Sequence, residues 1–92
     1  MNYYGQIAMD HWARWLPAQY AMIQNKDSFF LDLGSRASSR IDELALEFAG
    51  SDQPGETYLD KVGRLGEARH RAEQIVLSEM ILLEPEPDAT EN

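Results

Sequence analysis

The chain is predicted to form an all-α fold, a three-helix bundle made of one long antiparallel helical hairpin and a kinked N-terminal helical arm. Two long segments carry apolar residues at steps of three and four, which is the period of a helix with one buried face. A short connection of turn-forming residues separates these segments, and such a connection makes neighbouring helices antiparallel. We expect the hairpin to consist of residues 27–50 and 56–83.

The N-terminal arm is the first element expected. Apolar residues recur at helical spacing from Tyr4 to Trp15, and Asn2 is a suitable N-cap. The Leu16-Pro17 step interrupts this pattern. Proline disfavours α geometry in the residue before it but is favourable as the first residue of a helix. The arm is therefore predicted to kink or break at Pro17.

The second element is a long helix, with Asp27 or Ser28 as its N-cap and Gly50 as the glycine that ends it. Gly34 lies near its apolar stripe, where the missing side chain permits close helix approach at a cost of about 1 kcal/mol in helix propensity. The stripe consists of Phe30, Leu33, Ala37, Ile41, Leu44 and Phe48.

The third element is the longest helix expected, and at about 1.5 Å per residue it would be roughly 40 Å long. It ends where its apolar pattern ends, after Leu83, so that residues 1–83 form a single helical domain. The following segment, 84–92, contains two prolines and four acids and is predicted to be a disordered acidic tail. The apolar stripe of the third helix contains Tyr58, Val62, Leu65, Ala68, Ala72, Ile75, Val76, Met80 and Leu83.

Composition narrows the class of protein. The 92 residues, 43% of them hydrophobic, suffice for one small core, and the absence of cysteine excludes disulfides, thiolate metal sites and cysteine nucleophiles. The N-terminal residues do not resemble a signal peptide, and no window reaches the roughly 18–20 apolar residues of a membrane span. We therefore expect a soluble, cytoplasmic protein.

Charge indicates the kind of partner. Sixteen acidic and eight basic residues give a formal net charge of −8. A chain this acidic is repelled by phosphate backbones and by anionic lipid surfaces. We therefore expect no direct binding to nucleic acid and no binding to membranes, and the partner that the charge favours is a protein with a basic surface.

Four of the eight basic residues stand four positions after an acid, which is the favourable order on a helix and contributes about 0.2–0.5 kcal/mol per pair. We expect these bases to be paired locally and not offered to a ligand. The expected pairs are Asp10–Arg14, Asp32–Arg36, Asp60–Arg64 and Glu67–Arg71.

Few residues are candidates for catalysis or metal binding. His70 has Glu67 and Glu73 three positions away on either side, but carboxylate-rich metal sites repeat such units on at least two helices. Glu79, among apolar neighbours, is the best candidate for a general acid or base. No phosphate loop or nucleophile elbow is present. We expect no enzyme, no cofactor and no metal, with an enzyme or metal protein built on these four residues as the least favoured alternative.

Aromatic residues are dense in the first third of the chain. They could anchor a partner, because Trp and Tyr are enriched in binding hot spots, or they could form the core that closes the arm onto the hairpin. We favour the core for most of them. Trp15 is the exception that we assign to partner binding, because Trp12 already belongs to the apolar stripe of the N-terminal arm.

The main candidate site is a group of acidic residues around the connection between the two long helices. The chain has six acids and no base between Arg40 and Lys61, and the hairpin gathers them at one end. Glu47 lies near the negative end of its helix, an unfavourable place that costs about 0.3 kcal/mol or more. This acidic pole could dock a basic surface, or it could be a solvated cap that only keeps the protein soluble. The acidic pole consists of Asp42, Glu43, Glu47, Asp52, Glu56 and Asp60.

Three segments of the chain carry a resemblance: HWARWLPAQYAMI, DSFFLDLG and PGETYLDKVGRLGEARHRAEQIVLSEM. They resemble short uncharacterised helical proteins carried by actinobacterial phages and mobile elements. The resemblance covers most of residues 3–83 and implies a mobile-element setting, but it implies no activity and no functional residue.

These observations predict a non-catalytic protein-interaction module in which the acidic pole and Trp15 contact a basic partner. One form of this function is an inhibitor of a nucleic-acid-handling complex, of the anti-CRISPR or anti-restriction type, which occupies a basic channel meant for phosphates. The alternative is an accessory or assembly subunit that acts as a homodimer, with two hairpins paired into a four-helix bundle and the charge serving only solubility.

Overall fold

The computed structural model describes residues 2–89, and within this range all regular secondary structure is helical. The predicted all-α fold is therefore confirmed. The helices are α1 (Tyr3–Trp15), α2 (Pro17–Ala21), α3 (Lys26–Ala49) and α4 (Tyr58–Val76), followed by a π-helical turn (Leu77–Ile81) and a 3-10 turn (Pro87–Ala89).

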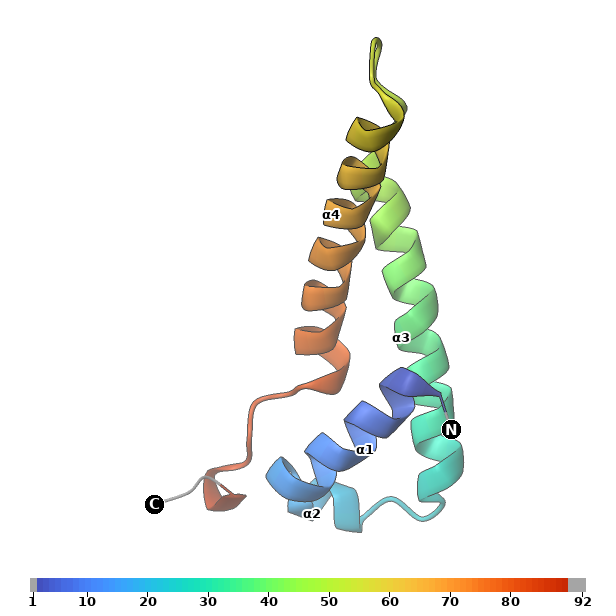
Figure 1. Ribbon diagram of the computed structural model, residues 1–92. Coiled ribbons are helices and arrows are strands. Elements are labelled where there is room, and N and C mark those ends of the chain that lie inside the picture. The colour runs from blue at the N-terminus through green and yellow to red at the C-terminus, as the bar shows by residue number, and fades with distance from the viewer. Residues whose placement is uncertain (1, 90–92) are drawn as a thin grey trace.

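The molecule is an elongated rod built on the antiparallel pair α3 and α4, with principal extents of 53 × 31 × 16 Å. These two helices lie close together near the connection between them and diverge toward the other end (Figure 1). We call the part formed by residues 42–69 the turn end. At the opposite end, the open end, lie α1, α2 and the C-terminal segment (Figure 1). Within residues 2–89, no helix is long and apolar enough to cross a membrane.

Short polar residues set the ends of the long helices. Asn25, and not Asp27 or Ser28, is the N-cap of α3, because its side-chain Oδ1 accepts a hydrogen bond from the Ser28 amide at 3.2 Å. Gly50 ends α3 with a positive φ of 65°, a conformation that favours glycine. Thr57 and Asp60 form a reciprocal capping box that begins α4.

The predicted break at Leu16-Pro17 is confirmed. Leu16 leaves the helical region, with φ −128° and ψ 53°, and Pro17 begins α2 as its first residue. The Leu16 side chain is almost completely buried, so that the break turns an apolar residue into the core while the chain changes direction.

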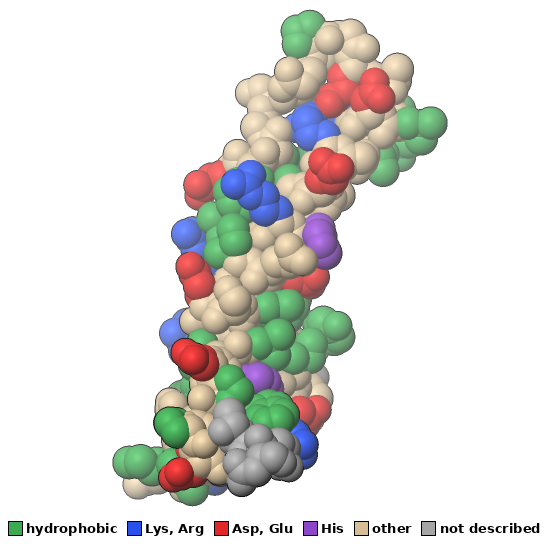
Figure 2. Space-filling view, turned by 90° about the vertical axis from the view of Figure 1, so that its left-hand side faces the viewer, with side chains coloured by type: hydrophobic (Ala, Val, Ile, Leu, Met, Phe, Trp, Pro, Cys, Tyr) green, Lys and Arg blue, Asp and Glu red, His purple; other side chains and the backbone are tan. Residues whose placement is uncertain are grey.

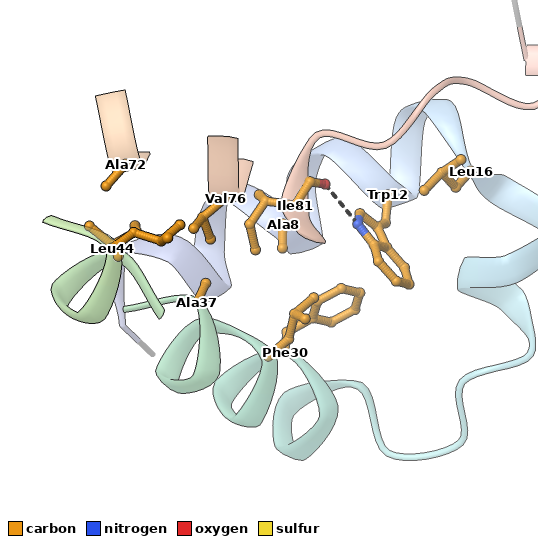
Figure 3. Close-up of a cluster of buried hydrophobic side chains, with 11 residues drawn as sticks. Ala8, Trp12, Leu16, Phe30, Ala37, Leu44, Ala72, Val76 and Ile81 are labelled. Atoms are coloured by element: carbon orange, nitrogen blue, oxygen red, sulfur yellow. Dashed lines mark hydrogen bonds between the residues drawn. The ribbon is translucent and has the colours of Figure 1, made fainter. Parts of the chain in front are cut away.

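The hydrophobic core lies mostly at the open end, where α1 packs against α3 and the end of α4 (Figure 3). The ring of Trp12 meets the ring of Phe30 edge to face, with centroids 5.4 Å apart and planes at 89°. Phe30 is fully buried. The core contains Ala8, Trp12, Leu16, Phe30, Leu33, Ala37, Ile41, Leu44, Ala72, Val76 and Ile81.

The third helix is not a continuous α-helix to Leu83. It changes to a π-helical turn after Val76, and Ile81 is fully buried although it does not belong to the predicted stripe. A π turn contains more residues per turn than an α turn, so it rotates the following side chains relative to the α-helical stripe. The Ile81 carbonyl accepts a hydrogen bond from the indole Nε1 of Trp12 at 2.9 Å (Figure 3).

Within residues 84–89, the described part of the predicted disordered tail, Glu86 contacts α1 and α2. The Glu86 carboxylate accepts hydrogen bonds from the amides of Ala18 and Gln19 at 3.0 and 3.1 Å, and the Glu86 amide donates to the Trp15 carbonyl at 2.9 Å. A carboxylate at a helix N-terminus is favourable because the amides there lack helical partners. Composition alone does not reveal this capping contact, and the remaining residues of the predicted tail, 90–92, lie outside the described range.

The start of α1 sits directly on α3 at Gly34. Asn2 Oδ1 accepts from the Gly5 amide at 2.7 Å, and Asn2 Nδ2 donates to the Leu31 carbonyl at 3.2 Å. A Cβ atom at position 34 would lie 2.0 Å from Asn2 Oδ1 and 2.5 Å from the Gly5 amide nitrogen. Gly34 therefore permits the close approach that the sequence suggested, and the helix that approaches is α1. We call this contact between α3 and the start of α1 the seat of α1.

We predict that Gly34→Ala destabilises the protein by about 1–3 kcal/mol, because α1 must move away from α3 to admit the methyl group. Urea unfolding followed by circular dichroism measures the change. The matched control is Gly63→Ala, at an exposed position of α4 with no atom within 4 Å of the added Cβ, which should gain about 0.5–1 kcal/mol. Equal effects of the two substitutions would contradict the proposed seat.

Candidate functional site

The structure places all six acids of the predicted acidic pole at the turn end. They do not form one patch, however. On α3, Asp42 shares a stripe with Ala45 and Ala49, whereas Glu43 and Glu47 lie on a neighbouring stripe, because successive helical residues point in different directions. The other three acids lie in the connection and in the first turn of α4: Asp52, Glu56 and Asp60.

An ion-pair cluster fastens the connection to α4. Arg64 donates to Glu56 at 2.7 Å, to Asp52 at 3.1 Å and to the Ala49 carbonyl, and Lys61 donates to Asp52 at 2.9 Å. The bond from Lys61 holds the pKa of Asp52 below its ordinary value, and the bond from Arg64 does the same for the pKa of Glu56. These carboxylates therefore hold the connection in place.

The other acids of the pole differ in their surroundings. Asp42 accepts from Arg69 at 2.9 Å, which raises the pKa of the guanidinium, and Glu43 accepts from Arg40 at 3.1 Å. Glu47 makes no ion pair with another described residue. Even with these pairs, the turn end as a whole carries seven carboxylates and three bases.

Of the four local ion pairs expected from sequence, only Asp32–Arg36 forms, at 2.9 Å. In the other three pairs the acid and the base do not bind each other: Asp10, for example, accepts a hydrogen bond from Gln6, and Arg14 lies over the ring of Trp15. Arg71 lies over the ring of Phe48, with 4.4 Å from the guanidinium carbon to the ring centroid, and Asp60 belongs to the capping box. Arg64 and Arg69 instead bind acids of the connection and of α3 across the hairpin, which spacing along one helix does not predict.

An apolar groove at the turn end is the part of the site that sequence reasoning missed. It has a volume of about 370 Å³ and lies between α3 and α4. The predicted stripe of α4 is not buried here: Tyr58 is 79% exposed, and Val62 and Leu65 are also exposed. The groove is lined by Asp42, Ala45, Leu46, Ala49, Leu65 and Arg69.

The stripe remains uncovered because α1 covers only the open end of the hairpin. Two large apolar residues outside the predicted stripes, Leu46 and Leu59, are also 76% and 77% exposed at this end. On the face drawn in Figure 2, hydrophobic side chains stand at the end that carries the connection, close to acidic and basic side chains. The periodicity shows that a face is apolar, but it does not show how far along the helix another element reaches.

Trp15 does not join the acidic pole. It lies at the end of α1, at the open end of the rod, whereas the acids lie at the turn end (Figure 1). The indole is half-buried, and the Arg14 guanidinium lies over it, 4.6 Å from the ring centroid. The two parts of the predicted partner site are therefore separated along the rod.

The residues considered for catalysis or metal binding are also dispersed. Glu73 accepts a hydrogen bond from the Tyr4 hydroxyl, and His70 and Glu67 are exposed on α4. Glu79 lines a separate open hollow together with Arg36 and other residues of α3. Among residues 2–89, no three His, Asp or Glu side chains are grouped so that they could hold a metal ion.

No protein-family model, curated protein or solved structure matches the chain. The candidate site is therefore defined by geometry and charge alone. It consists of the turn end of the hairpin, with an apolar groove between two helices and an excess of carboxylates around it.

The contact between Tyr4 and Glu73 joins α1 to α4 at the boundary of the open end. The Tyr4 hydroxyl donates to Glu73 Oε2 at 2.5 Å. Burial and then this hydrogen bond raise the pKa of Tyr4 to about 12. Because the folded value lies above the ordinary value of 10.0, the contribution of Tyr4 to stability is complete below pH 10 and is lost as the pH rises through about 12.

We therefore predict that the difference between the tyrosinate absorbance curves of the native chain and Tyr4→Phe has its midpoint at a pH of about 12. Ultraviolet titration of the folded proteins measures this value. The stability difference between the two proteins should also shrink above pH 10, as measured by urea unfolding at a series of pH values. A midpoint near the ordinary tyrosine value would contradict the contact.

Proposed function

We propose that the protein is a non-catalytic protein-interaction module that binds a partner with a basic surface through the turn end of its hairpin. The observation that carries this proposal is the exposure of large apolar side chains on an end that is rich in carboxylates. Monomeric proteins rarely leave large contiguous apolar surfaces exposed, and those that exist are often binding sites. The exposed side chains are those of Leu46, Tyr58, Leu59, Val62 and Leu65.

The two features of the turn end have different roles in this proposal. Apolar side chains that become buried supply most of the binding free energy of a protein interface. The excess of seven carboxylates over three bases supplies a negative potential that attracts a basic partner and rejects acidic ones. Ion pairing within the chain does not remove this potential, because the charges of the seven carboxylates and three bases still sum to a negative value.

Within this class, we propose inhibition of a nucleic-acid-handling complex, of the anti-CRISPR or anti-restriction type, in the cytoplasm of a cell that carries a phage or mobile element. A channel that binds phosphates is lined with arginine and lysine. The turn end is slim, because only two helices form it, and it is acidic (Figure 1). These properties suit an element that enters such a channel in place of nucleic acid.

A second candidate function is supported by the same exposed stripe. Two hairpins that bury this stripe against each other would form a four-helix bundle, and the protein would then be an accessory or assembly subunit that works as a homodimer. In that case the carboxylates would serve solubility only. The two functions differ in whether binding depends on charge.

We predict that reversing three acids of α3, in the combined variant Asp42→Lys, Glu43→Lys and Glu47→Lys, weakens partner binding at least about tenfold. The partner is captured on the immobilised protein, identified by mass spectrometry and purified. Its Kd for each variant is then measured at low and at high salt. Binding to the native chain should weaken as salt increases, because the attraction between exposed charges is screened.

The control reverses three exposed acids that lie outside the turn end and changes the net charge equally: Asp10→Lys, Glu79→Lys and Glu84→Lys. It should bind like the native chain. Equal binding by all three proteins would refute the charge-dependent function and favour the homodimer. A dimer measured by sedimentation, with no salt-sensitive partner, would have the same meaning.

A further inference from the structure

The seat of α1 is formed by one stripe of α3 and one stripe of α4. On α3, Asn2 bonds to the Leu31 carbonyl and to Ser35 Oγ, on either side of Gly34. On α4, Tyr4 bonds to Glu73. The N-terminal turn of α1 thus bridges both long helices on the same side of the hairpin.

The α3 stripe that carries α1 continues into the groove. Residues at steps of three and four lie on one face of a helix. From Gly34, such steps lead through Ser38 to Asp42, Ala45 and Ala49, and the last three line the groove. Two of these residues are alanines, which allow another backbone to approach closely, as Gly34 does for α1.

The α4 stripe continues in the same way. From Glu73, steps of four lead to Arg69 and Leu65, and further steps of three and four lead to Val62 and Tyr58. Arg69 and Leu65 line the groove. The salt bridge from Arg69 to Asp42 joins the two stripes where the covered part ends. The groove is therefore the uncovered continuation of the surface on which α1 rests.

The exposed α4 stripe, of which the groove is one part, is as long as one short helix. At about 1.5 Å per residue, the α4 stripe from Arg69 to Tyr58 is roughly 16 Å long. A helix of about eleven residues has the same length, which is close to the 13 residues of α1. The described chain has no helix of its own for this position, since α2 and the C-terminal segment lie at the open end (Figure 1).

Charge favours a partner's helix over a second copy of this chain. A second copy seated through the same groove would bring together two ends that each carry seven carboxylates and three bases. These ends would repel each other. A helix with lysine and arginine beside its apolar face would instead be attracted by the same potential.

We infer that the groove at the turn end binds a single amphipathic α-helix of a partner protein, about three turns long, with a leucine-rich face toward Ala45, Leu46 and Leu65 and with basic flanks. This inference rests on the proposed function and specifies the element of the partner that is recognised. The bound helix takes the place at the turn end that α1 takes at the open end.

The test uses the full chain and two synthetic peptides about four helical turns long. Both carry leucines at helical spacing, and the remaining positions are mainly lysine in one and glutamate in the other. The lysine peptide should bind, gain helicity by circular dichroism, and shift the amide resonances of residues 42–49 and 58–69. Leu46→Asp and Leu65→Asp should each weaken its binding at least about tenfold, because a carboxylate would be buried under the apolar face.

Leu31→Asp and Met22→Asp are the matched controls, because both residues are exposed and apolar but lie at the open end. They should bind the lysine peptide like the native chain. Binding of the glutamate peptide with equal affinity, or resonance shifts confined to the open end, would overturn the inference. A dimer that Leu46→Asp dissociates would also overturn it, since the occupant would then be a second copy.

Failure of this inference can be separated from failure of the proposed function. If the purified partner loses affinity for the charge-reversed chain but binds Leu46→Asp and Leu65→Asp normally, the turn end is the binding site and the groove is not. If the affinity of the partner is unchanged by both sets of substitutions, both proposals fail.

Discussion

The insertion of Trp12 between α3 and the end of α4 is the contact on which the tertiary structure depends. Its ring packs against Phe30 of α3, and its indole N–H bonds to the Ile81 carbonyl in the π-helical turn. One side chain thus joins the N-terminal arm to both helices of the hairpin. The π turn has a structural explanation here, because it buries Ile81 and places the Ile81 carbonyl beside the indole N–H.

Because the core gathers around this contact, the two ends of the rod are stabilised in different ways. At the open end, α1, α3 and the end of α4 pack together, and the C-terminal segment adds a contact in which Glu86 caps α2. The turn end has two helices, a capping box and the ion pairs of Arg64. The side chain of Asp52 is exposed, and exposed ion pairs contribute little to stability, whereas the pair between Arg64 and Glu56 is largely shielded from solvent. Segments with few buried contacts open at low free-energy cost, and binding elements are often drawn from them.

The turn end combines an exposed apolar surface with a net negative charge that favours a basic partner. The acids that the sequence predicts to be one unpaired group are largely ion-paired with Arg40, Lys61, Arg64 and Arg69, and these pairs hold the connection and the two helices together. Their excess over the bases remains and acts at longer range. Burial of Leu46 and its neighbours would supply the affinity, while the potential would set the association rate and the choice of partner.

The sequence by itself determined the local features: the helical class, the break at Pro17, the end of α3 at Gly50 and the position of the acids at one end of a hairpin. These follow from periodicity, caps and turn residues, which act over a few positions. Only the tertiary structure decided that Arg64 and Arg69 reach across the hairpin, that Glu86 caps α2, and that Tyr58, Val62 and Leu65 stay exposed. Each of these depends on how far α1 extends along the hairpin and on side chains distant in the chain. The periodicity of an apolar stripe does not specify which element packs against it.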